Sequence, residues 1–304
     1  MLLEFDLGGA EWFVTAFAAR EPNMIAVYRS GKSPHPVTGH RVSGLSEEMV
    51  IAEDKMFKRL GLGTNPIDIE SARKQHMPEI LKASWYPRTM SIRQAAKKMN
   101  HGLNYRLGYK TYALKNEIEE REAKRIVELY RTKAYPGLGV STAGNPCWYD
   151  RIDKTIRDTR TLTNCFGRKC YFQGALDDST FRDATAFIPQ STVFDATTKA
   201  MRSLVDDESP EFEPAELLVQ GHDSLLTQYL SRDYTAMARF AIKLGLDYMS
   251  PTLDYGEPFK LSVGLKVGRR WGALEELVLT PDVDTLAGEL ARVDTERLTL
   301  SMAR

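Results

Sequence analysis

The sequence contains few of the residues that would indicate a special architecture. Its three cysteines, Cys147, Cys165 and Cys170, are an odd number without CxxC spacing, which argues against a disulfide framework or a zinc knuckle and suits a reducing cytosol. No apolar stretch approaches the roughly 20 residues that a membrane span needs, and the first residues lack the basic and apolar regions of a secretory leader. A folded cytoplasmic protein is therefore expected.

Charge is balanced overall but unevenly distributed. The formal net charge is zero, which by itself gives no support to nucleic-acid binding. Residues 88–115 nevertheless contain seven Lys and Arg and no acidic residue, whereas residues 204–216 are strongly acidic. A basic stretch in a neutral protein can be only a solvated helix face, and composition alone favours that interpretation. At 304 residues, the chain is long enough for one large domain or two packed subdomains.

The first residues predict a strand, a tight turn and a helix. In LLEFDL, residues 2–7, apolar and acidic residues alternate, which predicts a strand with Glu4 and Asp6 on one face. Two glycines follow, and the next stretch has helical spacing until it stops before Pro22. Asp6 is therefore expected at the end of a strand.

A second aspartate is expected at the tip of a hairpin. In residues 215–230, two apolar runs flank GHDS, which predicts two strands with His222 and Asp223 at the turn between them. Two aspartates on neighbouring strand ends could hold Mg²⁺, which prefers oxygen ligands. Isolated aspartates at strand ends are more often turn formers, however, so the pattern alone favours the structural interpretation.

A helix with one cationic face is predicted over about residues 91–107. Ser91 followed by Gln94 is a capping-box start, and helical spacing puts four polar side chains on one face. These are Arg93, Lys97, His101 and Tyr105. Gly102 lowers helix propensity, which indicates either a close approach to the backbone or a glycine tolerated for packing.

The rest of the chain is mostly helical in its middle part. Residues 46–82 and 112–131 are rich in Glu, Lys, Ala and Leu at helical spacing. Residues 260–268 alternate as in a half-buried strand, and an amphipathic helix is expected from Pro281 on.

Several motifs, taken in order, resemble family A DNA polymerases, the DNA polymerase I-like group. The three principal ones are DLGGAE, which resembles motif A, RQAAKKMNHGLNY, which resembles motif B, and QGHDS, which resembles motif C. Four further segments resemble other parts of the family: SPHPVT, FGRKCYF, RDATAFIPQSTVFD and LKVGRRWGALEEL. The resemblance runs from Asp6 to about Leu277, so a chance coincidence of short motifs is improbable.

The resemblance implies an α+β fold, with a palm built on an antiparallel sheet and a largely helical fingers subdomain. The expected division is palm over 1–33, fingers over 34–176, palm over 177–280 with its hairpin at about 215–230, and a C-terminal helical tail over 281–304. The family's thumb and exonuclease are not expected in this chain.

The resemblance also implies a two-metal reaction. Asp6 and Asp223 would be catalytic and would hold two Mg²⁺ ions, with the backbone carbonyl of Leu7 as a further ligand. Glu11 matches the residue that disfavours a ribose 2′-hydroxyl, which makes dNTPs the expected substrate. A first-turn Glu that complements the helix dipole is the alternative explanation for Glu11.

Other positions match residues that contact the nucleotide or the DNA. His35, Arg93 and Lys97 match groups that contact the triphosphate, while His101 and Tyr105 match groups at the sugar and base. Tyr105 would also bond the gate residue. Positions that correspond to contacts with primer-template DNA are Arg168, Lys169, Arg182, Gln190 and His222.

Four positions depart from the family's pattern. Ser224 replaces the Glu of motif C, His101 replaces an aromatic residue, and Arg106 and Ser191 stand where the family usually has glycine. Because the motif C Glu is peripheral to the metals, reduced rather than abolished activity is expected. Such drift is typical of phage enzymes, for which the location would be the host cytoplasm.

Three other functions are alternatives to DNA synthesis. A single-subunit RNA polymerase relative also uses His-Asp-Ser in motif C, but Glu11 and FGRKCYF argue against it. A non-catalytic DNA-binding remnant would keep the fold without activity. A metal phosphohydrolase built on His222 and Asp223 would need further histidine ligands, which the five scattered histidines do not supply.

The position of motif A at the start of the sequence indicates a split polymerase, and a truncated or mis-annotated gene is the alternative explanation. In the family, a long stretch precedes motif A. A separate partner chain carrying the thumb, the N-terminal palm and possibly a 3′–5′ exonuclease is therefore expected.

Overall fold

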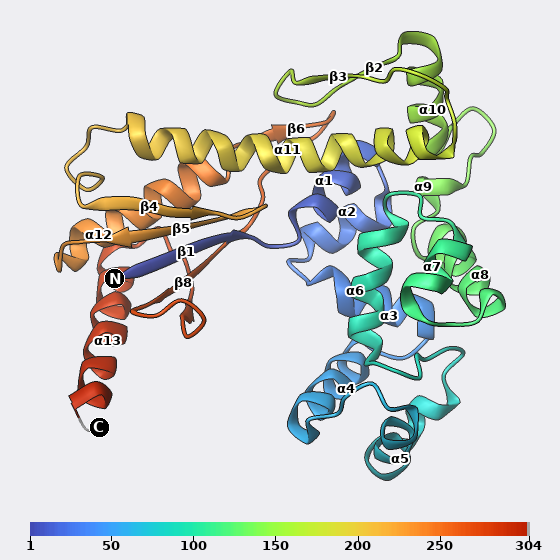
Figure 1. The fold of residues 1–304 in the computed structure, drawn as a ribbon, viewed down its shortest axis with the longest axis horizontal. Coiled ribbons are helices and arrows are strands. Elements are labelled where there is room, and N and C mark those ends of the chain that lie inside the picture. Colours follow the sequence, from blue (N-terminus) through green and yellow to red (C-terminus); the bar gives the residue numbers. More distant parts are fainter. Residues whose placement is uncertain (303–304) are drawn as a thin grey trace. The chain divides into compact units, whose positions relative to one another are not determined.

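The computed structural model describes residues 1–302, with side chains up to residue 295. The chain forms two compact units, shown in Figure 1: Met1–Glu11 with Gln190–Arg304, here the sheet unit, and Trp12–Pro189, here the helical unit. An antiparallel sheet and many helices confirm the expected α+β class. The finer division into palm, fingers and tail stays a prediction.

The sheet unit is built on five antiparallel strands in the order β4-β5-β1-β8-β9. Their bounds are β1 Leu2–Leu7, β4 Ala215–Gln220, β5 Ser224–Tyr229, β8 Val263–Gly268 and β9 Glu275–Leu277. A two-stranded ribbon and three helical segments complete the unit: β6 Leu253–Asp254, β7 Pro258–Phe259, α12 Tyr234–Ile242, the π-helical η3 Lys243–Met249 and α13 Val283–Met302. The first strand of the chain therefore lies at the centre of the sheet.

Strand β1 confirms the predicted alternation. Leu3, Phe5 and Leu7 are fully buried, whereas Glu4 and Asp6 are only partly covered on the opposite face. Phe5 packs edge-on against Phe240 of α12, with ring centroids 6.2 Å apart. The apolar face of β1 thus fixes which way its two carboxylates point.

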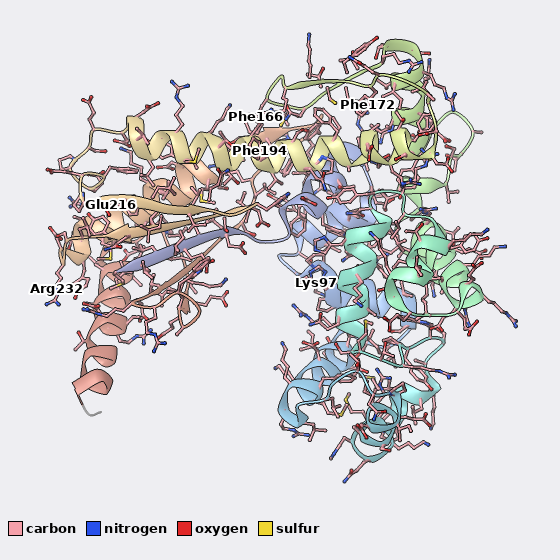
Figure 2. All side chains as sticks on the ribbon, viewed as in Figure 1. Lys97, Phe166, Phe172, Phe194, Glu216 and Arg232 are labelled. Atoms are coloured by element: carbon pink, nitrogen blue, oxygen red, sulfur yellow. The ribbon has the colours of Figure 1, made fainter. Side chains whose placement is uncertain are left out.

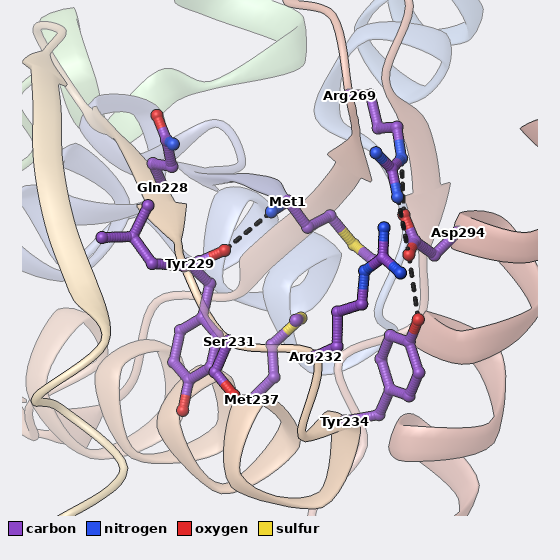
Figure 3. Close-up of a pocket in the computed structure, with 10 residues that line it drawn as sticks. Met1, Gln228, Tyr229, Ser231, Arg232, Tyr234, Met237, Arg269 and Asp294 are labelled. Carbon is purple, nitrogen blue, oxygen red and sulfur yellow. Dashed lines mark hydrogen bonds and ion pairs between the residues drawn. The ribbon is translucent and has the colours of Figure 1, made fainter. Parts of the chain in front are cut away.

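The beginning of β1 is tied to two other elements around a small pocket (Figure 3). The Met1 ammonium donates to the Tyr229 carbonyl at 2.7 Å, which continues the pairing of β1 with β5. Beside them, Arg269 donates to both carboxylate oxygens of Asp294, at 2.8 and 3.0 Å, and Tyr234 donates to the same carboxylate. These bonds connect α13 to the sheet. The last two residues of the predicted tail, 303–304, lie outside the described residues.

The helical unit consists of short helices and one two-stranded ribbon. Its helices are α1 Ala10–Ala19, α2 Pro22–Arg29, α3 Pro34–Ser43, α4 Glu47–Leu60, α5 Pro66–His76, the 3₁₀ helix η1 Pro78–Lys82, α6 Ile92–Leu103, α7 Tyr109–Asn116, α8 Glu120–Leu129, the π-helical η2 Tyr130–Ala134, α9 Pro136–Gly139 and α10 Trp148–Thr159. The ribbon is β2 Thr161–Thr163 with β3 Lys169–Tyr171. The 29-residue helix α11, Asp178–Asp206, begins in the helical unit and ends in the sheet unit.

Helices α3 and α6 pack closely together. A Cβ added at Gly39 of α3 would lie 3.0 Å from Val50 and 3.1 Å from Ile92, so the absence of a side chain permits this contact. Ile92, Ala95, Ala96 and Met99 are buried on one side of α6, and Lys97 and His101 are exposed on the other. The predicted amphipathic character of this helix is confirmed.

The end of α6 differs from the expected 91–107. The helix stops at Leu103, so Tyr105 lies in the following turn and not on the helical face. Arg106 has a left-handed backbone, with φ of 63°, which a continuous helix does not allow.

Of the helices that the structure describes, none combines the length and the apolar character required to cross a membrane.

Candidate active site

Strand register brings Asp6 and Asp223 together from distant parts of the sequence. Asp6 is paired with Ser224 of β5, and the Leu7 amide donates to the Asp223 carbonyl at 3.0 Å. The two aspartates therefore stand at the same end of two adjacent central strands. The predicted hairpin is confirmed, with His222 and Asp223 between β4 and β5.

The turn that carries Asp223 is tight. The Gly221 amide donates to the Ser224 carbonyl at 2.8 Å, and a Cβ at Gly221 would come within 2.3 Å of the Ser224 hydroxyl. Any larger residue at position 221 would displace Ser224. On the other side of β1, Asp6 is paired with Gly264 of β8, whose missing side chain leaves room beside the aspartate.

The two aspartates form a locally negative site. Burial and, second, the nearby Asp223 carboxylate raise the pKa of Asp6, while Lys266 partly opposes the shift. Burial and the neighbouring negative charge thus make ionisation of Asp6 less favourable. A bound divalent cation would reverse this effect, because its charge favours the ionised form of both groups.

The donor set fits a hard cation that keeps other ligands. Among the side chains that the structure describes, those of residues 1–295, no three carboxylate, imidazole or thiol groups form a cluster that could hold a metal ion. Asp6 and Asp223 offer two carboxylates, and Leu7, which follows Asp6 in the chain, offers a backbone carbonyl. Mg²⁺ is often bound through one or two carboxylates, with waters and substrate phosphates at its remaining positions.

Two further predicted residues meet in the sheet unit. Glu11 lies in the first turn of α1, and its Oε1 is 3.4 Å from Nε2 of His222. The His222 side chain is 61% exposed and that of Glu11 is 17% exposed. The residue predicted to select the sugar thus contacts the residue predicted to lie at the primer end.

In the helical unit, α3 and α6 gather a second, cationic group of residues. Arg93, Lys97 and His101 follow one another along α6, and Figure 2 shows Lys97 on this helix. His35 of α3 lies within electrostatic reach of all three. Burial first, and then these three groups, lower the pKa of His35 to about 4. His35 is therefore neutral at physiological pH.

A polar network that the sequence did not predict orients His35. The Asn100 amide nitrogen lies 3.1 Å from Nδ1 of His35. The Asn100 carbonyl oxygen accepts hydrogen bonds from Thr38 at 2.9 Å and from Tyr130 at 3.1 Å. All these partners of Asn100 come from elements packed around α6, so the imidazole has a defined orientation. An asparagine on the buried face of an amphipathic helix is the only sequence signal for this network.

Acidic residues of α4 hold the start of α6. The Ser91 hydroxyl accepts from the Gln94 amide, which confirms the predicted cap, and donates to Asp54 at 2.7 Å. Glu53 accepts from the Ile92 amide at 2.7 Å. Asp54 also lies 3.7 Å from the guanidinium of Arg93. These contacts fix the first turn of the helix that carries the cations.

Glu53 is held by a buried arginine that sequence reasoning missed. Arg73 is 1% exposed, donates to Glu53 at 2.8 Å and also donates to the carbonyls of Pro87 and Met90. Acidic and basic residues in an amphipathic helix normally face solvent, so the sequence does not indicate that Arg73 and Glu53 are buried. The buried pair is fully hydrogen-bonded, as such pairs require.

Leu107 is the close neighbour expected at Gly102. A Cβ at Gly102 would lie 2.9 Å from the Leu107 side chain, which packs back onto the end of α6. The Gly102 carbonyl accepts from the amides of Tyr105 and Leu107 at 3.2 and 3.1 Å. The close approach to the backbone at Gly102 is therefore made by Leu107 of the same chain.

The residues predicted to contact DNA stand on separate elements. Arg168 and Lys169 are neighbours at the β2-β3 ribbon, where the Asn164 side chain accepts from the Arg168 amide at 3.0 Å. Arg182 and Gln190 are both on α11, the former in the helical unit and the latter in the sheet unit. His222 is in the hairpin turn. Their common role stays a prediction.

The carboxylate pair and the cationic helix together suit a protein that handles phosphorylated substrates with a divalent cation. A comparison with protein families supports this class, because residues 74–273, more than half of the chain, match the model of DNA polymerase family A. The chain therefore belongs to DNA polymerase family A. Asp6, Glu11 and His35 precede the matched segment, so their assignment rests on motif resemblance.

The fold is also similar to a solved polymerase structure. The POL domain of Pol1 from M. smegmatis, in complex with DNA primer-template and dNTP, has a TM-score of 0.63 and 18% sequence identity. The similarity covers 90% of this chain and 40% of that one, so this chain spans less than half of its length. At this identity, the likeness concerns the fold. No curated protein matches the chain in sequence.

Proposed function

We propose that this chain carries out template-directed DNA synthesis, adding dNTPs to a primer 3′-hydroxyl. The observation that supports it most is the pairing of Asp6 with Ser224, which puts Asp6 beside Asp223 on adjacent strands. Membership of DNA polymerase family A supports the reaction class. The M. smegmatis relative in fold was solved with primer-template and dNTP, the ligands proposed for this chain.

Asp6, Asp223 and the Leu7 carbonyl would hold two Mg²⁺ ions. When bound, these ions would supply activation of the primer hydroxyl and charge stabilisation at the leaving pyrophosphate. The protein's own contribution is a pair of carboxylates fixed by the central strands. Burial first, and then the Asp223 carboxylate, raise the pKa of Asp6, and a bound cation would offset both effects.

The cationic group on α6 would bind the triphosphate. Lys97 and Arg93 carry fixed positive charge, while His35 is neutral and can act only through a hydrogen bond. Asn100 lies against Nδ1 of His35, which leaves Nε2 as the imidazole nitrogen available to a phosphate oxygen. His101 and Tyr105 would contact the sugar and base of the incoming nucleotide.

Glu11 would act as the sugar gate, and exposed residues of both units would contact DNA. A carboxylate at the gate disfavours a 2′-hydroxyl and so selects dNTPs. For the primer-template, the proposed contacts are Arg168, Lys169, Arg182, Gln190 and His222. Cationic and amide side chains of this kind suit phosphate and base-edge contacts.

A separate partner chain with thumb and N-terminal palm, phage origin and a host-cytoplasm location belong to the same proposal. They rest on the motif resemblance alone. Synthesis by the chain mixed with the product of the gene immediately upstream tests the partner, since a partner should raise primer extension and an unrelated DNA-binding protein should not.

Primer extension with dNTPs and rNTPs tests the proposed function. With Mg²⁺ and a primed template, the chain, with or without its partner, should incorporate dNTPs in template order and discriminate against rNTPs. Preferential rNTP incorporation would favour the RNA polymerase alternative, which the serine at position 224 of motif C, Ser224, supports. Absence of incorporation under all these conditions would indicate a DNA-binding remnant.

A further inference from the structure

Arg106 occupies a backbone conformation that needs support from its surroundings. Its φ of 63° is left-handed, a region that favours glycine and that a long side chain such as arginine adopts only at a free-energy cost. The residue follows Tyr105 directly and closes the turn at the end of α6. Something in the fold must therefore hold this arginine in place.

The guanidinium of Arg106 is bound by α10. Both of its terminal nitrogens donate to Asp153, Nη1 to Oδ1 and Nη2 to Oδ2, the latter at 3.0 Å. The guanidinium also lies over the rings of Tyr149 and Phe181, 5.4 Å from each centroid. A two-bond contact between planar groups fixes orientation as well as distance, which a lysine would not do.

The same helix holds the backbone at the end of α6. The Tyr149 hydroxyl donates to the Leu103 carbonyl at 2.6 Å. Arg131 donates to the Leu107 carbonyl at 3.0 Å and lies over the Tyr149 ring. The segment from Leu103 to Leu107, which includes Tyr105, is thus held on both sides of Arg106.

We propose that Arg106 is a positioning residue: through Asp153 it holds the turn at the end of α6 and so sets the place of Tyr105. This inference rests on the proposed function, in which Tyr105 contacts the nucleotide. The ion pair, with side chains 28% and 18% exposed, is the part of the contact that single substitutions can remove. The contact of Arg106 with Asp153 thus holds this turn in one geometry.

Four variants separate positioning from folding. Arg106→Ala and Asp153→Asn both break the ion pair, and Arg106→Gly breaks it while relieving the left-handed backbone. Lys154→Ala is the matched control, because Lys154 is adjacent to Asp153 on α10 and pairs with the exposed Asp158 on the same helix. Thermal unfolding of each variant reports on folding separately.

Two measurements then test the proposal. In primer extension, the three ion-pair variants should raise the KM for dNTP about fivefold or more while kcat changes less than about twofold. In hydrogen exchange of the full chain, amides of residues 102–107 should exchange faster in these variants. In Lys154→Ala, their exchange rates should stay as in the wild type. Arg106→Gly should show the same KM as Arg106→Ala, whatever its stability.

The proposal is overturned if KM and exchange stay unchanged in Arg106→Ala and Asp153→Asn, or change equally in Lys154→Ala. It is also overturned if Arg106→Gly restores the KM, because backbone strain and not the ion pair would then matter. If the unmodified chain extends no primer either alone or with its partner, the proposed function fails instead, and hydrogen exchange at 102–107 still decides whether Arg106 holds the turn.

Discussion

The sheet unit and the helical unit assemble their candidate site residues in different ways. In the sheet unit, Asp6 and Asp223 meet because β1 and β5 pair in one register. In the helical unit, Arg93, Lys97 and His101 share one side of α6 because they are four residues apart. A slip of one residue would turn Asp6 to the other face of the sheet, whereas the spacing on α6 depends only on the helix.

The two groups also differ in charge and in what stabilises them. Burial, and second the charge of Asp223, raise the pKa of Asp6, so the aspartates gain from a bound cation. The cations of α6 surround a histidine whose pKa they help to lower, and they gain from a bound anion. Substitutions in the first group should therefore act on metal-dependent chemistry, and those in the second on nucleotide affinity.

The largest expected effect is the loss of activity in Asp223→Asn. The change keeps the shape of the side chain but removes one of two metal-binding charges, which is worth several kcal/mol in the transition state. Mg²⁺-dependent primer extension should fall about a thousandfold or more, while DNA binding measured by anisotropy is retained. Extension near the wild-type rate would show that Asp223 is not a metal ligand.

Lys97→Ala should have the next largest effect. A contact between a cation and a phosphate contributes about 1.5–3 kcal/mol, so kcat/KM for dNTP should fall about 10- to 100-fold. The matched control is Lys98→Ala, since Lys98 is also exposed on α6 but points about 100° away from Lys97. Equal losses in the two variants would mean that general positive charge, and not the predicted face, binds the nucleotide.

Glu11→Ala should change sugar selection more than rate. Without the gate carboxylate, the ratio of kcat/KM for dNTP over rNTP should fall about tenfold or more. Glu216→Ala, a change at an exposed carboxylate of β4 (Figure 2), serves as the control and should leave the ratio as it is. If Glu11→Ala discriminates between dNTP and rNTP as well as the wild type does, the Glu11 carboxylate is not the sugar gate and only complements the dipole of α1.

The smallest expected effect on activity comes from the protonation of His35, which acts on stability. Its pKa is lowered to about 4 in the folded chain from 6.5 in the unfolded one, so the unfolded state binds more protons between these values. Stability should therefore fall as the pH decreases from about 6.5 to about 4, by at most about 3 kcal/mol. His35→Gln should remove this dependence, which urea unfolding at several pH values measures. A His35 NMR titration midpoint near 6.5 would contradict the assignment.

Local patterns were sufficient to predict several parts of the fold and the site. Alternation in residues 2–7 and the GHDS turn predicted β1 and the hairpin, and Ser91 with Gln94 predicted the start of α6. These features depend on neighbours within a few residues. The family resemblance then supplied residue roles that composition alone could not give.

Nonlocal features were beyond such patterns. The pairing of β1 with both β5 and β8 joins segments from opposite ends of the sequence. Arg73 and Glu53 form a buried ion pair, although charged residues of this kind in a helix are usually found on its solvated surface. The early end of α6 depends on Arg106, whose left-handed backbone is held by Asp153 from another helix. In each case, tertiary contacts decide against the local preference.

The central claim is that the strand register builds a cation site from Asp6 and Asp223. Binding of Mn²⁺, used as a probe for Mg²⁺ and measured by electron paramagnetic resonance on the full chain, tests it without requiring activity. Asp6→Asn and Asp223→Asn should each weaken binding about tenfold or more, and Glu216→Gln should not. Equal Mn²⁺ affinity in the wild type and in both aspartate variants would contradict the claim.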